Sequence, residues 1–166
     1  AWTTREVDRR TSAWARVRPD EHGRDPGADA GRPLTVLVDS NVLLDVLTED
    51  PKWSAWSGQA LADCAERSQL AINPLVYAEI SIRFERIEEL EDALPARDFV
   101  RLPLPWEAAF LAGKCFVRYR RRSGSRRSPL PDFYIGAHAS VAGLTLLTRN
   151  ATRYRSYFPS LEIIAP

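Results

Sequence analysis

Short apolar runs alternate with longer mixed stretches through most of this chain. The first run, LTVLV at 34–38, has no charged residue and is rich in branched side chains, which is typical of a buried strand. Four further short strands are predicted by apolar runs at 70–72, 99–102, 144–148 and 161–165. Strands that alternate with helices form βαβ units. The pattern therefore predicts an α/β fold, with a central parallel sheet of four to five strands flanked by helices.

Three of the helices between these strands are expected to start at a polar capping residue: Ser40, Asp50 and Asn73. The helix after Ser40 is expected to begin near Asn41. Proline follows the other two caps and suits the first helical position, and the helix after Asp50 is expected to run to about Ser68.

Three more helices are predicted further along the chain. The first is charged, covers 85–94 and ends before a proline. The second carries one regularly spaced face, formed by Trp106, Phe110, Gly113 and Val117. The third follows a loop over 123–131 and ends at Gly143, a residue that favours helix termination.

The first 33 residues differ in composition from the rest of the chain. Charges, glycines and prolines are mixed there, so we expect a charged N-terminal extension (a short helix over 2–18 and a linker over 19–33) before one domain at 34–166. The first twenty residues lack the apolar core of a secretory signal, and no apolar run is long enough to cross a bilayer. Two isolated cysteines, Cys64 and Cys115, suggest buried thiols in a reducing compartment. These features predict a cytoplasmic protein without a membrane segment.

Acidic and amide side chains fall at the places where a parallel α/β sheet gathers its functional groups. Asp39 directly follows the first strand, and Asn150 lies two residues after the strand at 144–148. Glu79 and Asp132 lie near helix starts. Carboxylates that converge from distant segments suit a hard divalent cation such as Mg²⁺, which can activate water and offset phosphate charge.

Each acid also has an ordinary structural interpretation. Asp39 suits a helix cap, Asp132 suits the dipole at a helix start, and Glu79 could pair with Arg83 on a helix surface. Position alone does not separate these interpretations from a metal site. Asp45, six residues after Asp39, is expected on a solvated helix face.

Four segments in order resemble the successive motifs of VapC-family PIN-domain toxins of type II toxin–antitoxin systems. They are VLVDSNVLL at 36–44, NPLVYAEI at 73–80, LPDFYIGAHA at 130–139 and LTRN at 147–150. The resemblance covers 34–166 and implies a PIN-like fold and an endoribonuclease that cuts RNA with Mg²⁺ or Mn²⁺. It further implies a cognate VapB-type antitoxin, and we expect a homodimer.

The resemblance also implies roles for particular residues. Those matching the family's catalytic positions are Asp39, Glu79, Asp132 and Asn150, of which the first three match its metal ligands. Ser40, Asn41 and Thr148 would orient ligands and water through hydrogen bonds.

The sequence departs from the family pattern at one catalytic position. The family usually has aspartate where this chain has Asn150. A variant of the family keeps asparagine there and supplies the acid three residues later, but this chain has Arg153 at that place. Three acids should hold one metal ion adequately and a second one poorly.

A basic stripe without an acid runs from the helix expected around Val117 into the loop that follows. Its members are Lys114, Arg118, Arg120, Arg121, Arg122, Arg126 and Arg127. It could be a solvated helix end, but seven like charges also suit the phosphates of RNA, and we expect its six arginines to bind the RNA backbone. His138, between two alanines on a helix, is expected to pack rather than to act as a base.

Two alternatives to an active toxin remain open at this stage. The loss of an acid at Asn150 is compatible with a silent PIN fold that binds RNA or an antitoxin without cutting. A basic segment ahead of the domain also resembles an antitoxin tail, which could place one of the arginines between Arg5 and Arg32 in the acidic site.

Overall fold

Five parallel strands form the centre of the molecule, as the sequence pattern predicts. The computed structural model describes residues 34–122 and 124–166, so the helix and linker expected over 1–33 lie outside the described residues. The strands are β1 (Thr35–Val38), β2 (Gln69–Ile72), β3 (Val100–Arg101), β4 (Thr145–Leu147) and β5 (Ile163–Ile164). They pair in the order β3-β2-β1-β4-β5, so the first strand of the chain is the middle strand of the sheet.

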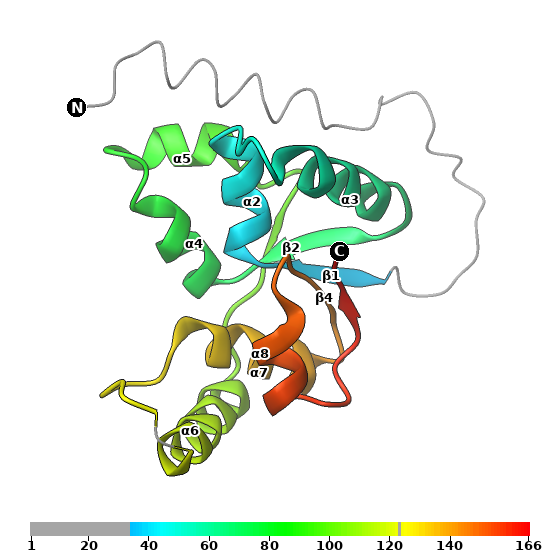
Figure 1. Cartoon of the computed structure of the whole chain (residues 1–166). Coiled ribbons are helices and arrows are strands. Elements are labelled where there is room, and N and C mark those ends of the chain that lie inside the picture. The colour runs from blue at the N-terminus through cyan, green and yellow to red at the C-terminus, as the bar shows by residue number, and fades with distance from the viewer. Residues whose placement is uncertain (1–33, 123) are drawn as a thin grey trace.

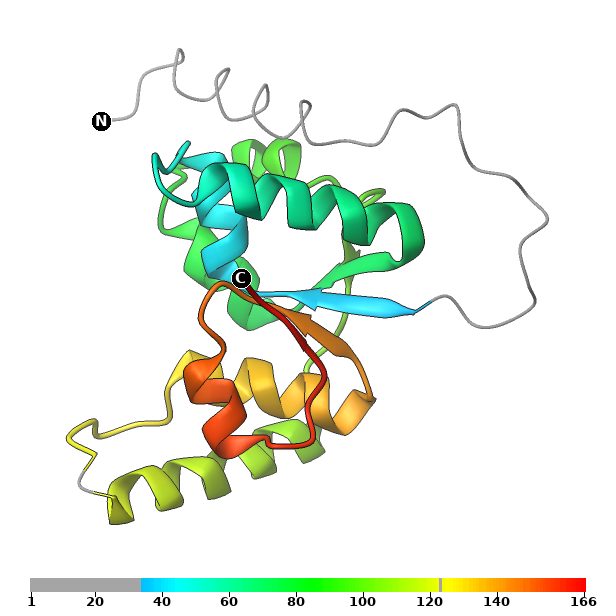
Figure 2. The ribbon, with the colours of Figure 1, turned by 45° about the vertical axis from the view of Figure 1, so that its right-hand side comes forward.

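Helices cover both faces of this sheet (Figure 1, Figure 2). One face carries α2 (Ser40–Leu47), α3 (Ser54–Arg67), α4 (Pro74–Ser81) and α5 (Ile87–Ala93). The other face carries α6 (Trp106–Arg121), α7 (Pro131–Ala142) and α8 (Ala151–Tyr157). Strand order explains the division, because the chain moves one way from β1 to β3 and then returns past β1 to form β4.

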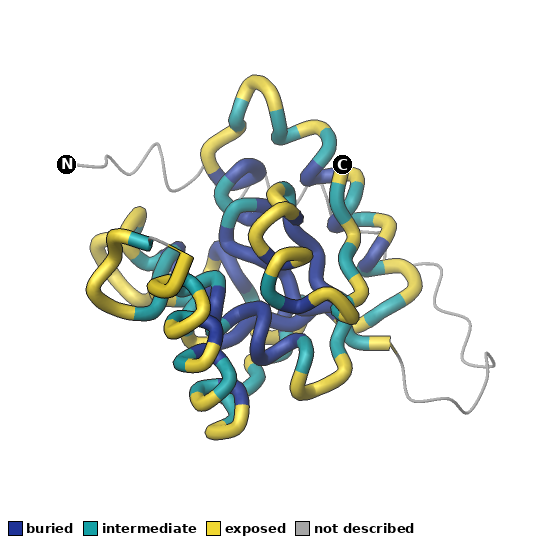
Figure 3. The backbone as a smooth tube through the Cα atoms, turned by 60° about the horizontal axis from the view of Figure 1, so that its bottom comes forward, coloured by how far each residue is buried: buried dark blue, intermediate teal, exposed yellow. Residues whose placement is uncertain are grey.

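Burial follows from this layered arrangement. Val36, Leu37 and Val38 are all buried, because helices cover β1 on both faces. Figure 3 shows the buried residues concentrated along the central strands and the exposed ones on the outer turns. Both cysteines are buried and free, as expected from the sequence. In the part of the chain that the structure describes, no helix is long and apolar enough to cross a membrane.

Local signals place some helix ends correctly and others wrongly. The side chain of Asn73 caps α4 by accepting hydrogen bonds from the amides of Leu75 and Val76, and Gly143 ends α7 with a φ of 63°. The expected cap at Ser40 is wrong, since α2 begins at Ser40 and Asp39 holds the cap position. The hydroxyl of Ser40 instead donates a hydrogen bond to the carboxylate of Glu79.

The start expected for the second helix is also wrong. Asp50 accepts hydrogen bonds from the amides of Lys52 and Trp53, which closes a turn before the helix. The helix α3 then begins at Ser54, three residues after Pro51.

Three further features differ from the pattern-based expectations. Asp45 is buried, not solvated, and Ser57 and Arg149 compensate the charge of its carboxylate. The regularly spaced face of α6 points to solvent, with Trp106 and Phe110 exposed, while small residues on its other side pack against the core. The helix α8 was not predicted, although it turns out to carry part of the candidate site.

Candidate active site

The candidate site lies at the carboxyl ends of β1 and β4, in the middle of the sheet. The two strands are paired with Val38 opposite Leu147, and the amide of Asp39 donates to the carbonyl of Leu147 over 2.9 Å. The chain crosses to opposite sides of the sheet after these two strands. In open α/β sheets this topological switch point is where ligands bind.

Asp39 is a nearly buried carboxylate with three donors on one oxygen. Its Oδ2 accepts hydrogen bonds from Asn41 Nδ2 at 2.7 Å, Thr148 Oγ1 at 2.7 Å and the Tyr154 hydroxyl at 3.1 Å. Among the described residues, every side-chain hydrogen bond to Asp39 is made to Oδ2. The carboxylate is therefore fixed in orientation while Oδ1 has no protein donor in that part of the chain.

Asn41 and Thr148 join the two strand ends around this carboxylate. Besides bonding Asp39, Asn41 Nδ2 donates to Thr148 Oγ1 at 3.1 Å, and Asn41 Oδ1 accepts from the amide of Arg149 at 3.0 Å. Thr148 Oγ1 also accepts from the amide of Asn150 at 3.1 Å. These bonds hold the segment after β4 against the segment after β1.

Glu79 and Asp132 approach Asp39 from two different helices. Glu79, half-buried on α4, accepts a hydrogen bond from Ser40 Oγ at 2.7 Å. Asp132, in the first turn of α7, forms an ion pair with Arg153 of α8. We call Asp39, Glu79 and Asp132 the acidic site.

The three carboxylates of the acidic site act on one another electrostatically. Burial raises the pKa of Asp39 from 3.8 to about 6, against the hydrogen bonds from Thr148 and Tyr154, and the negative charges of Asp132 and Glu79 add to the rise. Burial also raises the pKa of Glu79, with a contribution from Asp132. The charges of the three acids therefore interact in one region, where burial makes negative charge costly at Asp39 and Glu79.

Such a region suits a cation by its chemistry, although a complete ligand set is not preformed. Within residues 34–122 and 124–166, no group of three acidic, histidine or cysteine side chains is arranged to hold a metal ion as it stands. All three carboxylates have protein partners instead: Asn41, Thr148 and Tyr154 for Asp39, Ser40 for Glu79 and Arg153 for Asp132. Hard oxygen ligands with uncompensated charge are what Mg²⁺ and Mn²⁺ prefer.

Asn150 is close to the acidic site through its backbone. Its amide bonds Thr148, but the residue is exposed and its side chain makes no capping bond to α8. The fourth family position is therefore next to the site and contributes neither charge nor a hydrogen bond to the acids.

Two residues that bind carboxylates in or near the site were not predicted from the sequence. Tyr154 is buried and donates to Asp39, and Arg149 binds the buried carboxylate of Asp45 at 3.2 Å. A signal existed for Tyr154, because Ala151, Tyr154 and Phe158 have helical spacing and would have indicated a buried helix face. Nothing local indicated the Arg149–Asp45 pair.

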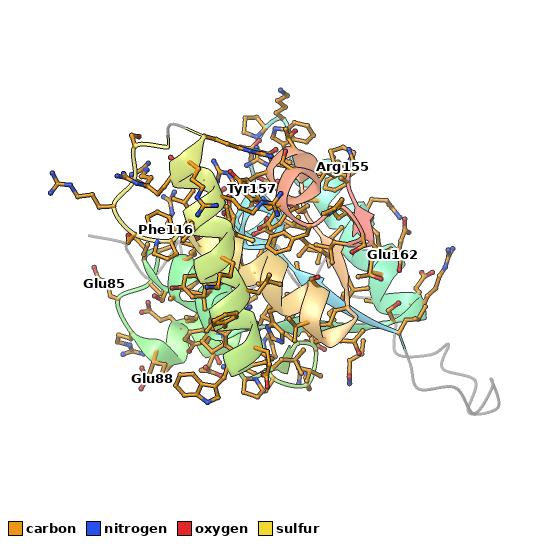
Figure 4. All side chains as sticks on the ribbon, turned by 90° about the horizontal axis from the view of Figure 1, so that it is seen from below. Glu85, Glu88, Phe116, Arg155, Tyr157 and Glu162 are labelled. Carbon is orange, nitrogen blue, oxygen red and sulfur yellow. The ribbon has the colours of Figure 1, made fainter. Side chains whose placement is uncertain are left out.

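The basic stripe is solvent-exposed at each of its seven cationic residues. In the described part of the chain, none of them forms an ion pair with an acid. The acids that might have paired with them have other partners, since Glu88 and Glu89 lie beside Arg86, and Glu91 binds Arg101. Tyr157 of α8 points toward α6 (Figure 4), where the guanidinium groups of Arg118 and Arg122 lie 5.6 and 5.9 Å from its ring.

His138 is buried and lies 3.2 Å from the amide nitrogen of Asn73. Burial lowers its pKa, which keeps the ring neutral and able to accept that hydrogen bond. The expectation of a packed histidine is confirmed.

Comparison with known proteins gives a match to a family model. The PIN domain family model matches residues 36–157. No match to the chain was found among curated proteins.

Solved structures are similar in fold at low sequence identity. VapBC2 from Rickettsia felis bound to a promoter DNA fragment is 17% identical with a TM-score of 0.61, and VapBC-1 from nontypeable Haemophilus influenzae is 16% identical with a TM-score of 0.60. DNA-bound VapBC from Salmonella typhimurium is 19% identical with a TM-score of 0.57. Each match covers 80% of this chain and 98% of the other.

Proposed function

This chain belongs to the PIN domain family, and from that premise we propose that it is a metal-dependent endoribonuclease that serves as the toxin of a toxin–antitoxin pair. The observation that carries the proposal is the acidic site. Asp39 directly follows β1 at the topological switch point, where burial and the negative charges of Asp132 on α7 and Glu79 on α4 raise its pKa to about 6.

The three carboxylates are the proposed ligands of Mg²⁺ or Mn²⁺. When bound, such an ion supplies an activated water and offsets charge on the phosphate under attack. Asp39 would offer Oδ1, because Asn41, Thr148 and Tyr154 hold its Oδ2. Ser40 orients Glu79 through the 2.7 Å bond to Oε2.

The basic stripe is the proposed RNA-binding surface. Its arginines form no ion pair with an acid among the described residues and can neutralise backbone phosphates. They are Arg118, Arg120, Arg121, Arg122, Arg126 and Arg127. Through Tyr157 the stripe is joined to α8, the helix that also carries Tyr154 at the acidic site. RNA bound along α6 would thus lie near the carboxylates.

The proposed partners are RNA and a VapB-type antitoxin, with a homodimer as the expected assembly in the cytoplasm. Support for the antitoxin comes from the neighbours in fold, three of which are VapBC complexes. If the N-terminal segment has the arginine tail of an antitoxin, truncation before residue 34 should raise activity.

Cleavage of RNA in the presence of Mn²⁺ tests the proposal. We expect cleavage that EDTA abolishes and that Asp39→Asn reduces at least a hundredfold, since this change removes the buried ligand charge. The matched control is Asp63→Asn, which changes the same functional group at an exposed position of α3. Cleavage that survives EDTA, or equal rates for the parent and Asp39→Asn, would overturn the proposal.

A second candidate function is a silent PIN fold that binds RNA without cutting it. The exposed, neutral Asn150 favours it, because the family position lacks its carboxylate. Asn150→Asp distinguishes the two candidates. If the parent is a weakened enzyme, the added carboxylate should raise Mn²⁺ affinity and cleavage together. If the parent is silent, RNA binding should be present without Mn²⁺-dependent cleavage.

A further inference from the structure

The ion pair between Arg153 and Asp132 lies at the acidic site and is not accounted for by the proposed chemistry. Arg153 is in the first turn of α8, one residue before Tyr154, whose hydroxyl bonds Asp39. Asp132 is the carboxylate whose charge raises the pKa of both Asp39 and Glu79. A permanent cation of the protein is therefore bound to the acid that acts on both of the others.

A contribution to fold stability does not explain why this ion pair is present. The Arg153 and Asp132 side chains are 48% and 30% exposed, and ion pairs at such positions contribute little to the free energy of unfolding. The ion pair has a larger effect on the net charge of the acidic site. Three carboxylates carry three negative charges, and Arg153 reduces the total to two, which one divalent ion balances.

A fourth carboxylate of the acidic site would have to come from the start of α8. Asn150 is neutral, and Arg153 is positive where an acid would bring a fourth negative charge. A guanidinium stays protonated at every relevant pH, so its charge cannot be removed by titration. A second divalent ion would have to displace Arg153 from Asp132 and would then lie beside it.

We propose that Arg153 is a built-in cation of the acidic site, which competes with metal for Asp132 and limits the site to one divalent ion. The inference rests on the proposed metal site. It assigns Arg153 a positioning role, because the residue acts through Asp132 and not on the substrate.

Mn²⁺ binding, measured by calorimetry and by electron paramagnetic resonance, tests the inference without reference to activity. The parent should bind one Mn²⁺. Arg153→Gln removes the competing charge and should bind that ion about tenfold more tightly. Arg153→Asp supplies a carboxylate in its place and should bind two ions, with a resonance spectrum broadened by their coupling.

Arg155→Gln is the matched control, since Arg155 is exposed on the same helix (Figure 4) and loses the same charge. Its affinity for Mn²⁺ should change less than twofold. Circular dichroism of all variants verifies that the fold is kept.

The outcomes separate this inference from the proposed function. If the parent binds Mn²⁺, Asp39→Asn abolishes the binding and Arg153→Gln leaves it unchanged, then Arg153 is not a competitor and the metal site stands. If Arg155→Gln increases the affinity for Mn²⁺ as much as Arg153→Gln does, the effect comes from the overall charge of the protein. That result would also overturn the inference. If neither the parent nor any Arg153 variant binds Mn²⁺, the metal site itself is wrong.

Discussion

At the scale of single residues, Asp39 is a buried carboxylate whose charge is unfavourable but is partly stabilised by hydrogen bonds. The residue is 3% exposed, and three side chains donate to one of its carboxylate oxygens. Buried carboxylates with a raised pKa are common in active sites, because the same burial that makes the charge costly also strengthens its interaction with a cation. The residue is thus expected to lower stability in the absence of metal.

The pH dependence of stability tests this expectation. The pKa of Asp39 in the fold, about 6, lies above the ordinary value of 3.8, so the fold binds the proton more tightly than the unfolded chain. Its stabilising effect is complete below about pH 4 and is lost as the pH rises through about 6. In EDTA at about pH 8, Asp39→Asn should be more stable than the parent by about 1–3 kcal/mol.

Urea unfolding of both proteins across this pH range measures the difference. It should close toward about pH 4, where the parent also carries a neutral side chain at this position. A difference that is the same at every pH would mean that Asp39 does not titrate in this way.

Tyr154 permits a second prediction at this scale. Burial and the nearby negative charge of Asp39 raise its pKa well above 10, so the hydroxyl stays protonated and donates. Tyr154→Phe removes one donor from a buried carboxylate and should cost about 1–2 kcal/mol of unfolding free energy near neutral pH. Tyr157→Phe on the same helix is the control, since no hydrogen bond from its hydroxyl is found among the described residues. Equal costs for the two variants would contradict the assigned role.

At the scale of elements, α8 reaches the site because α7 lets it approach closely. A Cβ at Gly136 of α7 would lie 2.4 Å from the ring of Phe158 and 2.9 Å from that of Tyr154. Only glycine leaves room for these two aromatic rings. The contact therefore sets the distance between the helix that carries Asp132 and the helix that carries Arg153 and Tyr154.

Two alanine substitutions test this packing. Gly136→Ala should destabilise the protein by about 1–3 kcal/mol and reduce RNA cleavage, because the rings must move. Gly113→Ala in α6 meets nothing within 4 Å and should stabilise by about 0.5–1 kcal/mol through helix propensity. Thermal unfolding measures both effects. If both substitutions destabilise the protein, the space around each glycine does not explain the difference expected between the two positions.

The elements also differ in how far pattern could predict them. The strands and α7 have local signals, namely branched apolar runs and a proline start with a glycine stop. The helix α6 was predicted, but its apolar face is exposed, because small residues on the other side allow close packing against α7. Periodicity identifies a helix face without stating what covers it.

At the scale of the whole molecule, opposite charges occupy different parts of a chain whose net charge is only +1. The acidic site lies at the carboxyl ends of the inner strands β1 and β4, and the basic stripe lies on α6 and the following loop. Binding through the stripe should weaken steeply with salt, because each neutralised phosphate releases counterions. The stripe also contributes little to stability, since its charges are exposed and lack acidic partners in the described residues.

A quadruple replacement tests the stripe. Changing Arg121, Arg122, Arg126 and Arg127 to serine should weaken RNA binding and flatten its salt dependence, with little change in melting temperature and none in Mn²⁺ affinity. Replacing the same four residues with lysine keeps the charge and should keep most of the salt dependence. RNA affinity across a salt series is the measurement. Unchanged binding by the serine variant would remove the stripe from the proposed interface, and unfolding of that variant would make the arginines structural.

The sequence by itself determined the α/β class and a central parallel sheet of four to five strands, because buried strands are local signals. It also proposed the members of the acidic site, because the family motifs keep their order along the chain. Only the tertiary structure decided the partners of these residues. Ser40 serves Glu79 rather than a helix end, Asp45 is buried by Ser57 and Arg149, and Arg153 binds Asp132 across the junction of α7 and α8. Each of these contacts joins segments whose distance depends on how the layers pack, and a residue's immediate neighbours in the chain carry no information about that distance.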